Sequence, residues 1–323
     1  MAGPTTTGPR PASLARIGHL LRCPLCGTRL SLDADRLHCP TGHVFEISGR
    51  VARFVRDNDS SDGELSLRTK RAFGNQWVQL GELATVTSDD LKLHLPEGFT
   101  ADETFKGLVL DAGCGMGRYT GLVAQAGATP VGMDFSRAVD KAAELWPDIT
   151  FIQADLTTPP FAPRSFDLVF SFGVLHHLSD PMAGFQKCFE LVKPGGMLLV
   201  WVYSAHGGVL RQVRQLARRV VKRAPAAKRP AALAAAVVIW CFYVWPNKLV
   251  SRGKSLRFYA DKKFPQLYVD CHDALAAPAE SYLRSEDCKD WVRSVEAMDS
   301  GFEMRRDGTG WLIWARRAKP VVP

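Results

Sequence analysis

The chain has 323 residues, of which 46% are hydrophobic and 23% charged, and it carries a net charge of +8. The length suffices for one large domain with a small appendage, and the composition is that of a soluble globular protein. No secretory segment precedes Arg22, and the eight cysteines do not form a disulfide framework, so we expect the reducing cytoplasm. This positive net charge is compatible with an anionic partner such as RNA, a phosphorylated metabolite or a lipid headgroup, but it does not indicate which of them binds.

A cluster of metal-binding residue types lies near the N-terminus. Cys23 and Cys26 are two residues apart, and Cys39 and His43 follow as a second pair. Two such pairs close a tetrahedron of thiolates and imidazole, which suits zinc better than an iron–sulfur cluster. We predict a closed structural Zn²⁺ site with these four ligands; the alternative is a reduced, metal-free turn.

Downstream, short apolar segments alternate with helical ones. Strands are predicted at 108–112, 130–134, 149–155, 166–172 and 196–203. Helices are predicted at 119–126 and 138–145, and a hairpin at 302–306 and 310–316 around Asp307 and Gly308. This alternation predicts an α/β fold with a mostly parallel sheet, covered on both faces and closed by an antiparallel hairpin.

The strongest chemical signal is the turn after the first predicted strand, where Asp111 precedes Gly113, Gly115 and Gly117. Glycines let the backbone turn tightly and approach a ligand with no side chain between them. A turn of this kind alone also suits NAD, FAD or a plain tight turn. The residues at the ends of the following strands therefore decide what it means.

Acidic residues end the next two predicted strands. Asp134 ends the second, where a carboxylate can accept hydrogen bonds from both ribose hydroxyls of a nucleoside cofactor. Asp155 ends the third and can accept a bond from an adenine amino group. Carboxyl ends of neighbouring parallel strands share one crevice, so Asp111, Asp134 and Asp155 are expected on the same rim. The alternative, that the last two merely cap helices, is disfavoured by their occurrence at consecutive strand ends.

Together these motifs resemble those of class I, Rossmann-like S-adenosylmethionine-dependent methyltransferases. The similarity covers nearly all of residues 108–203, including segments 153–156, 166–178 and 191–200. It implies S-adenosyl-L-methionine as cofactor, with Asp111 orienting its methionine end and Asp134 holding its ribose. The cofactor-binding residues that the resemblance implies are Asp111, Gly113, Cys114, Gly115, Gly117, Asp134, Phe135, Asp155, Leu156 and Phe172.

With this resemblance the chain divides into six segments. They are a disordered leader at 1–19, the zinc-binding module at 20–55, a linker and N-terminal helical region at 56–106, the S-adenosylmethionine-binding core at 107–204, a helical cap insertion at 205–267, and a C-terminal closing region with the hairpin at 268–323.

The cap insertion is basic and apolar. Apolar residues recur at helical spacing over 209–221 with arginines between them, and the apolar run at 231–245 is shorter than the roughly 20 residues that span a bilayer. Segments 71–77 and 272–278 are similar to those of bacterial biosynthetic methyltransferases, which implies that the insertion caps the acceptor pocket. We favour a solvated basic face over the alternative, peripheral contact with a membrane that presents a lipid-like acceptor.

His176 and His177 follow the fourth predicted strand, on the rim where a methyl group would emerge. A histidine titrates near neutral pH, so either could act as general base if the acceptor must lose a proton. The alternative is a structural role for both. Tyr268, His272 and Asp273 are weaker candidates from the cap side.

We predict a methyltransferase acting on a small-molecule or lipid-like biosynthetic intermediate, with O- or C-methylation favoured by analogy. The alternative is an RNA base methyltransferase that docks RNA through its zinc module, which resembles the one preceding the methyltransferase domain of large-subunit ribosomal RNA guanine methyltransferases. The Asn/Asp-Pro-Pro-Tyr/Phe signature of many base-amino methyltransferases is absent after the fourth strand. A third hypothesis, a non-catalytic scaffold, is opposed by the intact glycines, Asp111 and Asp134.

Overall fold

The computed structural model describes residues 12–33, 35–55, 86–205, 208–244, 263–276, 280–304 and 310–319. Residues 56–85 of the predicted linker and N-terminal helical region, which include the segment 71–77, and the hairpin turn at Asp307 and Gly308 lie outside the described residues.

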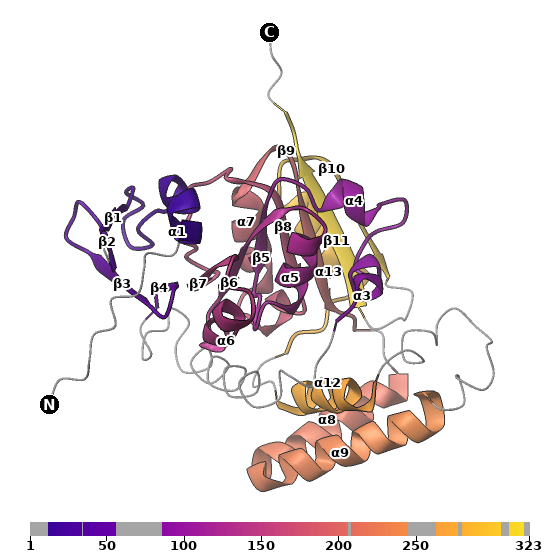
Figure 1. Cartoon of the computed structure of the whole chain (residues 1–323). Coiled ribbons are helices and arrows are strands. Elements are labelled where there is room, and N and C mark those ends of the chain that lie inside the picture. Colours follow the sequence, from indigo (N-terminus) through magenta and orange to yellow (C-terminus); the bar gives the residue numbers. More distant parts are fainter. Residues whose placement is uncertain are drawn as a thin grey trace, which may run out of the picture.

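The described strands form one eleven-stranded sheet in the order β1-β2-β3-β4-β7-β6-β5-β8-β9-β11-β10 (Figure 1). Its parallel centre consists of β5 (Leu108–Ala112), β6 (Thr129–Asp134), β7 (Thr150–Gln153), β8 (Phe166–Phe172) and β9 (Val192–Tyr203). The antiparallel β11 (Gly310–Arg317) pairs with β9, and β10 (Ala297–Met304) pairs with β11. This confirms the predicted Rossmann-like sheet with its C-terminal hairpin.

The fifth parallel strand begins earlier than predicted. Phe166 pairs with Val192 and Leu168 with Met197, so the strand contains a bulge before residue 196, where it was predicted to begin. Gly195 has φ of +80°, which lets the extra residues loop out without ending the strand.

Helices cover both faces of the parallel strands. They are α3 (Ser88–Lys92), α4 (Ala101–Thr104), α5 (Arg118–Gln125), α6 (Ala138–Leu145), α7 (Pro181–Glu190) and α13 (Ser285–Arg293). Val109 packs in one core with α3 and α5, whereas Leu110 packs in the other with α7 and α13. Successive strand residues point to opposite faces, so these two cores lie on opposite sides of the sheet.

The first described residues are helical, which corrects the prediction of a disordered leader for residues 12–19. Helix α1 (Ala12–Ile17) continues into the short 3-10 helix η1 (Gly18–Leu20). Leu14 and Ile17 lie three residues apart on one side of α1 and are buried in the main core. Their burial stabilises a helix that the Gly- and Pro-rich composition did not predict.

The N-terminal module, for which zinc binding is predicted, is continuous with the sheet. Its strands are β1 (Ser31–Asp33), β2 (Arg36–His38), β3 (Val44–Ser48) and β4 (Val51–Arg53). Strand β4 runs parallel to β7, with Ala52 opposite Ile152. The amide of Arg22 also donates to the carbonyl of Pro160 at 3.0 Å. The module thus extends the edge of the methyltransferase-like sheet.

Beyond β9 lies the helical cap, at the carboxyl end of the parallel strands (Figure 1). It contains α8 (Gly208–Arg223), η4 (Pro225–Ala227), α9 (Lys228–Ile239), the π-helical turn η5 (Trp240–Val244) and α12 (Phe264–Ala276). Helix α12 packs against α9, so the cap extends past its predicted end at 267. Pro230 lies in the first turn of α9, where proline is tolerated. Among the described residues, no helix combines the length and apolarity needed to cross a membrane.

Candidate functional site

The glycine turn follows β5 and wraps beneath the end of β6. The amides of Gly113 and Cys114 donate to the carbonyl of Met133 at 2.7 and 3.0 Å. Gly113 has φ of +94°, and a Cβ there would collide with the side chain of Val174. Gly117 has φ of +77° where it precedes α5. The positive φ angles, and at Gly113 the close packing of Val174, therefore require glycine in this turn.

Asp134 is fixed against this turn at the end of β6. Its Oδ2 accepts a 2.8 Å hydrogen bond from the amide of Gly115. Its Oδ1 accepts bonds from the amide and hydroxyl of Ser136 at 2.8 and 2.7 Å. Burial raises the pKa of Asp134 above its usual value, and these hydrogen bonds oppose the rise. The carboxylate is thereby held in one orientation beside the glycines.

Asp111 lies deeper, at the carboxyl end of β5, with 3% of its surface exposed. Its Oδ2 accepts a 2.6 Å hydrogen bond from the hydroxyl of Thr120. Burial, opposed by this bond, raises the pKa of Asp111 to about 7. Such a carboxylate favours a cationic ligand, because a nearby positive charge stabilises its ionised form.

Asp155 lies two residues past the end of β7. Its Oδ1 accepts bonds from the amide and hydroxyl of Thr157 at 2.8 and 2.7 Å. Gln153 ties this strand to its neighbour, because its Nε2 donates to the carbonyl of Phe135 at 3.1 Å. Leu156 is buried beside Asp155. The rim thus brings together the acids predicted at consecutive strand ends.

Phe172, at the end of β8, has a partner that sequence reasoning missed. His94 stacks on it with ring centroids 4.4 Å apart and also contacts the rings of Tyr119 and Trp201. Its Nδ1 donates to the carbonyl of Asp90 at 2.8 Å. His94 belongs to none of the sequence motifs. The one sequence feature that indicates a helix near it is the capping box at the start of α3.

The two adjacent histidines occupy η3 (Leu175–His177), after β8. The side chain of His176 is fully buried, with its ring 4.1 Å from that of Tyr203. His177 is partly exposed, so of the two it alone presents surface at the rim. On the cap side, burial, together with the positive charges of Lys228 and Arg229, lowers the pKa of His272 to about 4.

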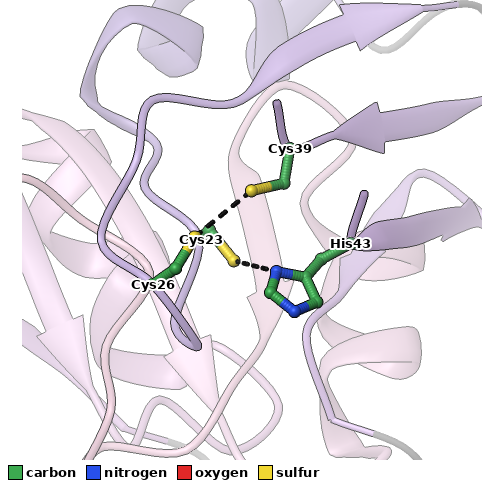
Figure 2. Close-up of side chains that lie close together, drawn as sticks. All are labelled: Cys23, Cys26, Cys39 and His43. Atoms are coloured by element: carbon green, nitrogen blue, oxygen red, sulfur yellow. Dashed lines mark hydrogen bonds between the residues drawn. The ribbon is translucent and has the colours of Figure 1, made fainter. Parts of the chain in front are cut away.

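The four predicted metal ligands converge on one point. Cys23 and Cys26 precede β1, Cys39 follows β2 and His43 precedes β3 (Figure 2). Their ligand atoms all lie within 4.8 Å of one another. The Sγ atoms of Cys26 and Cys39 are 3.3 Å apart, and Cys23 Sγ is 3.4 Å from Nδ1 of His43. Three sulfurs and one imidazole at this separation fit tetrahedral zinc.

Two threonine hydroxyls surround the sulfurs. Thr28 and Thr41 each lie 3.2 Å from the sulfur of Cys26, and they lie 3.0 and 2.9 Å from that of Cys39. These contacts lower the pKa of Cys26 to about 7. They favour the thiolate, which is the form that binds a metal.

A parallel sheet with a glycine turn and acids at consecutive strand ends defines a Rossmann-like domain for a nucleoside cofactor. Residues 110–200 match the protein family described as a methyltransferase domain. This part of the chain is therefore a class I S-adenosylmethionine-dependent methyltransferase domain.

Three curated relatives share this region. The chain is 33% identical over 157 residues to phosphoethanolamine N-methyltransferase 1 of Arabidopsis thaliana, covering 47% of this chain and 30% of that protein. It is 37% identical over 102 residues to a ubiquinone biosynthesis O-methyltransferase of Paracidovorax citrulli (29% and 41% covered). It is 40% identical over 98 residues to the demethylmenaquinone methyltransferase of Renibacterium salmoninarum (30% and 41%). The chain thus spans less than half of the length of these relatives.

Among solved structures, the 1,6-didemethyltoxoflavin-N1-methyltransferase of Burkholderia thailandensis, with bound S-adenosylhomocysteine, aligns over 90% of this chain and 98% of its own. Its TM-score is 0.45 at 14% identity.

Proposed function

We propose that the whole chain is an S-adenosylmethionine-dependent methyltransferase whose acceptor is a small-molecule or lipid-like biosynthetic intermediate, with O- or C-methylation favoured. The observation that carries this proposal is the meeting of Asp111 and Asp134 at the glycine turn. The relatives support a small acceptor, since their names refer to phosphoethanolamine, ubiquinone and demethylmenaquinone. We also propose that the chain acts in the cytoplasm, where the thiols of the metal site stay reduced.

The site residues fit the cofactor. S-adenosylmethionine, when bound, supplies a methyl group on a sulfonium centre. Gly113 keeps the turn in its positive-φ conformation under the side chain of Val174, and the buried carboxylate of Asp111 suits the ammonium group of the methionine end. Asp134 would hold the ribose hydroxyls, and Asp155 lies on the adenine side. Each role corresponds to one strand end of the sheet.

Alignment and exclusion of water supply much of the rate in a methyl transfer, and a base is needed only where the acceptor loses a proton. His177 is the base that we propose for that step, with the buried His176 as a residue that positions the loop. His177→Gln should then lower turnover more than about tenfold while leaving cofactor affinity unchanged. A turnover that stays within tenfold of wild type would remove His177 from this role.

We further propose that the Cys23, Cys26, Cys39 and His43 cluster holds a structural zinc ion. All four positions are filled by protein atoms, so no coordination site is open for catalysis. Purified protein is expected to contain one equivalent of zinc by elemental analysis, and Cys39→Ser should lose it. Full zinc content in Cys39→Ser would refute this ligand set.

Calorimetric titration with S-adenosylhomocysteine tests the cofactor site. Wild type is expected to bind, and Asp134→Ala should weaken binding at least tenfold because hydrogen bonds to a charged group contribute about 1.5–3 kcal/mol. Asp148→Ala, at an exposed position on the protein surface, is the matched control and should bind like wild type. Absence of binding by folded wild type would contradict the proposal.

Acceptor screening distinguishes the two candidate substrate classes. Phenolic, quinol and phospho-amine acceptors should be methylated in preference to RNA. A complex with bulk RNA that weakens steeply with salt, followed by base methylation, would favour the RNA methyltransferase alternative instead.

A further inference from the structure

The outer surface of the helical cap gathers exposed apolar side chains. Eleven large apolar residues are exposed among the described part of the chain, and six of them lie on α8, α9 and η5. They are Leu216, Val220, Leu233, Val237, Val238 and Phe242, between 43% and 72% exposed. Exposed apolar side chains that gather on consecutive elements indicate a surface that contacts another molecule or a membrane.

Helix α9 is apolar on every side from Ala231 to Ile239. Its inner residues Ala232 and Ala236 are buried in a cluster with Leu267 and Cys271 of α12. Its outer residues, among them Leu233, Val237 and Val238, face solvent. A helix that is apolar all round is normally buried all round, so the outer face is suited to a second apolar environment.

The positive charge of the protein lies on the same helices. Residues 208–244 contain eight lysines and arginines and no aspartate or glutamate. The rest of the chain has 33 basic and 33 acidic residues, so this segment accounts for the whole net charge of +8. On α8, Arg219 and Arg223 share the exposed face with Leu216 and Val220. The apolar patch is therefore flanked by cations.

The arrangement favours contact in the plane of a bilayer. In Figure 1, α8, α9 and α12 form a separate layer, with α9 farthest from the sheet. The 12 residues of α9 extend about 18 Å, less than the roughly 30 Å of a hydrocarbon core. Phe242, 72% exposed, follows α9 in η5, and phenylalanine is common on the apolar face of helices that lie in the membrane–water interface.

We propose that this outer surface of α8, α9 and η5 docks on a membrane containing anionic lipids. The arginines meet the headgroups, and the apolar side chains enter the boundary with the acyl chains. Docking does not depend on the proposed methyl transfer. It would bring the carboxyl end of the sheet, where the cofactor residues lie, close to the membrane surface.

Charge complementarity selects this occupant over two others. A two-fold dimer through the same surface would place the exposed Arg219 and Arg223 of one copy against the same basic face of the other. Nucleic acid supplies phosphates, but its backbone offers no apolar phase for the outer face of α9. An anionic membrane supplies both.

Co-sedimentation of the full chain with vesicles tests docking. Vesicles of phosphatidylcholine mixed with phosphatidylserine should pellet the protein, those of phosphatidylcholine alone should pellet much less, and raised salt should weaken binding. Failure to pellet with the mixed vesicles at low salt would overturn the proposal.

Substitutions identify the surface. Phe242→Ser should reduce the partition coefficient at least about tenfold, since burial of an aromatic side chain is lost. The double substitution Arg219→Gln and Arg223→Gln should reduce it about 25-fold, at about fivefold per arginine. The controls are Met298→Ser, 61% exposed on β10, and the pair Arg16→Gln and Arg293→Gln. These controls should bind like wild type.

Two outcomes would assign the surface differently. Equal losses in the controls would mean that the charge or apolarity of the whole chain, and not this face, determines binding. A concentration-dependent dimer that Phe242→Ser abolishes, without vesicle binding, would make a second copy the occupant. Either result would overturn membrane docking by the cap.

Discussion

The buried carboxyl of Asp111 predicts a pH dependence of both stability and cofactor binding. Burial raises its pKa from 3.8 to about 7 in the folded chain. Between these two pH values the folded state holds a proton that the unfolded state has released, so stability falls as the pH rises through this window. Above about pH 7 the loss is complete, and it amounts to about 4 kcal/mol of unfolding free energy at most.

Asp111→Asn removes this ionisable group while its amide oxygen can still accept the hydrogen bond from Thr120. We expect the ligand-free variant to be more stable than wild type at pH 8, by up to about 4 kcal/mol, and the difference to shrink toward pH 4. Urea denaturation at several pH values measures both effects. Asp148→Asn, at an exposed position, should change neither.

Lower pH should stabilise the folded chain but weaken its binding of the cofactor. The ammonium group of the methionine end favours ionised Asp111, so wild-type affinity for S-adenosylhomocysteine should fall by up to about tenfold for each pH unit below 7. Asp111→Asn should bind at least about tenfold more weakly at pH 8, with little pH dependence. The fully linked wild-type affinity should change by about 1.5 decades between pH 5.5 and 8.5. A flat wild-type profile over this range, or a variant less stable than wild type at pH 8, would refute this reasoning.

Three further predictions concern other parts of the molecule. Gly113→Ala should abolish cofactor binding because its Cβ would collide with Val174, whereas Gly127→Ala, with a similar φ but open space around it, should retain binding in calorimetry. Arg218→Met should lower the unfolding free energy by about 3–5 kcal/mol because the buried carboxylate of Glu280 loses its ion pair. Adding Glu280→Gln should restore most of this loss. An Arg218→Met variant as stable as wild type would contradict the pairing. Chelation of zinc should lower the melting temperature, measured by circular dichroism, because metal binding contributes to the folding free energy; an unchanged melting temperature would mean that the module folds without metal.

The parts of the fold that depend on neighbouring residues were predictable from the sequence. The glycine turn lies within a strand–turn–helix unit that spans only residues 108–125, so the local pattern alone was enough to locate Asp111 and its glycines. Asp134 and Asp155 followed from the rule that parallel strands share one carboxyl edge. The predicted metal ligands were recognisable because the two members of each pair lie within a few residues of each other in the sequence.

The parts that depend on distant partners were not predictable. Strand β4 has three residues, too few for a pattern, and its pairing with β7, a hundred residues later, is what joins the module to the parallel sheet. The helix at residues 12–17 is stabilised by burial of Leu14 and Ile17 against the same core. His94 reaches Phe172 through tertiary packing alone. No local spacing encodes these contacts.

The junction between β4 and β7 also determines what the sheet presents at its two ends. An unpaired strand edge is a template for association with another chain, and very short strands, charges and bulges reduce that risk. Without the module, β7 would be the unpaired edge strand at one end of the sheet. With the module, the edge strand there is β1, which is three residues long and ends in Asp33. At the other end, β10 carries Asp299 and Glu303 and a bulge between Ala297 and Asp299. A protein that loses its zinc is therefore expected to lose protection against aggregation at the module end of the sheet, while the hairpin end stays protected.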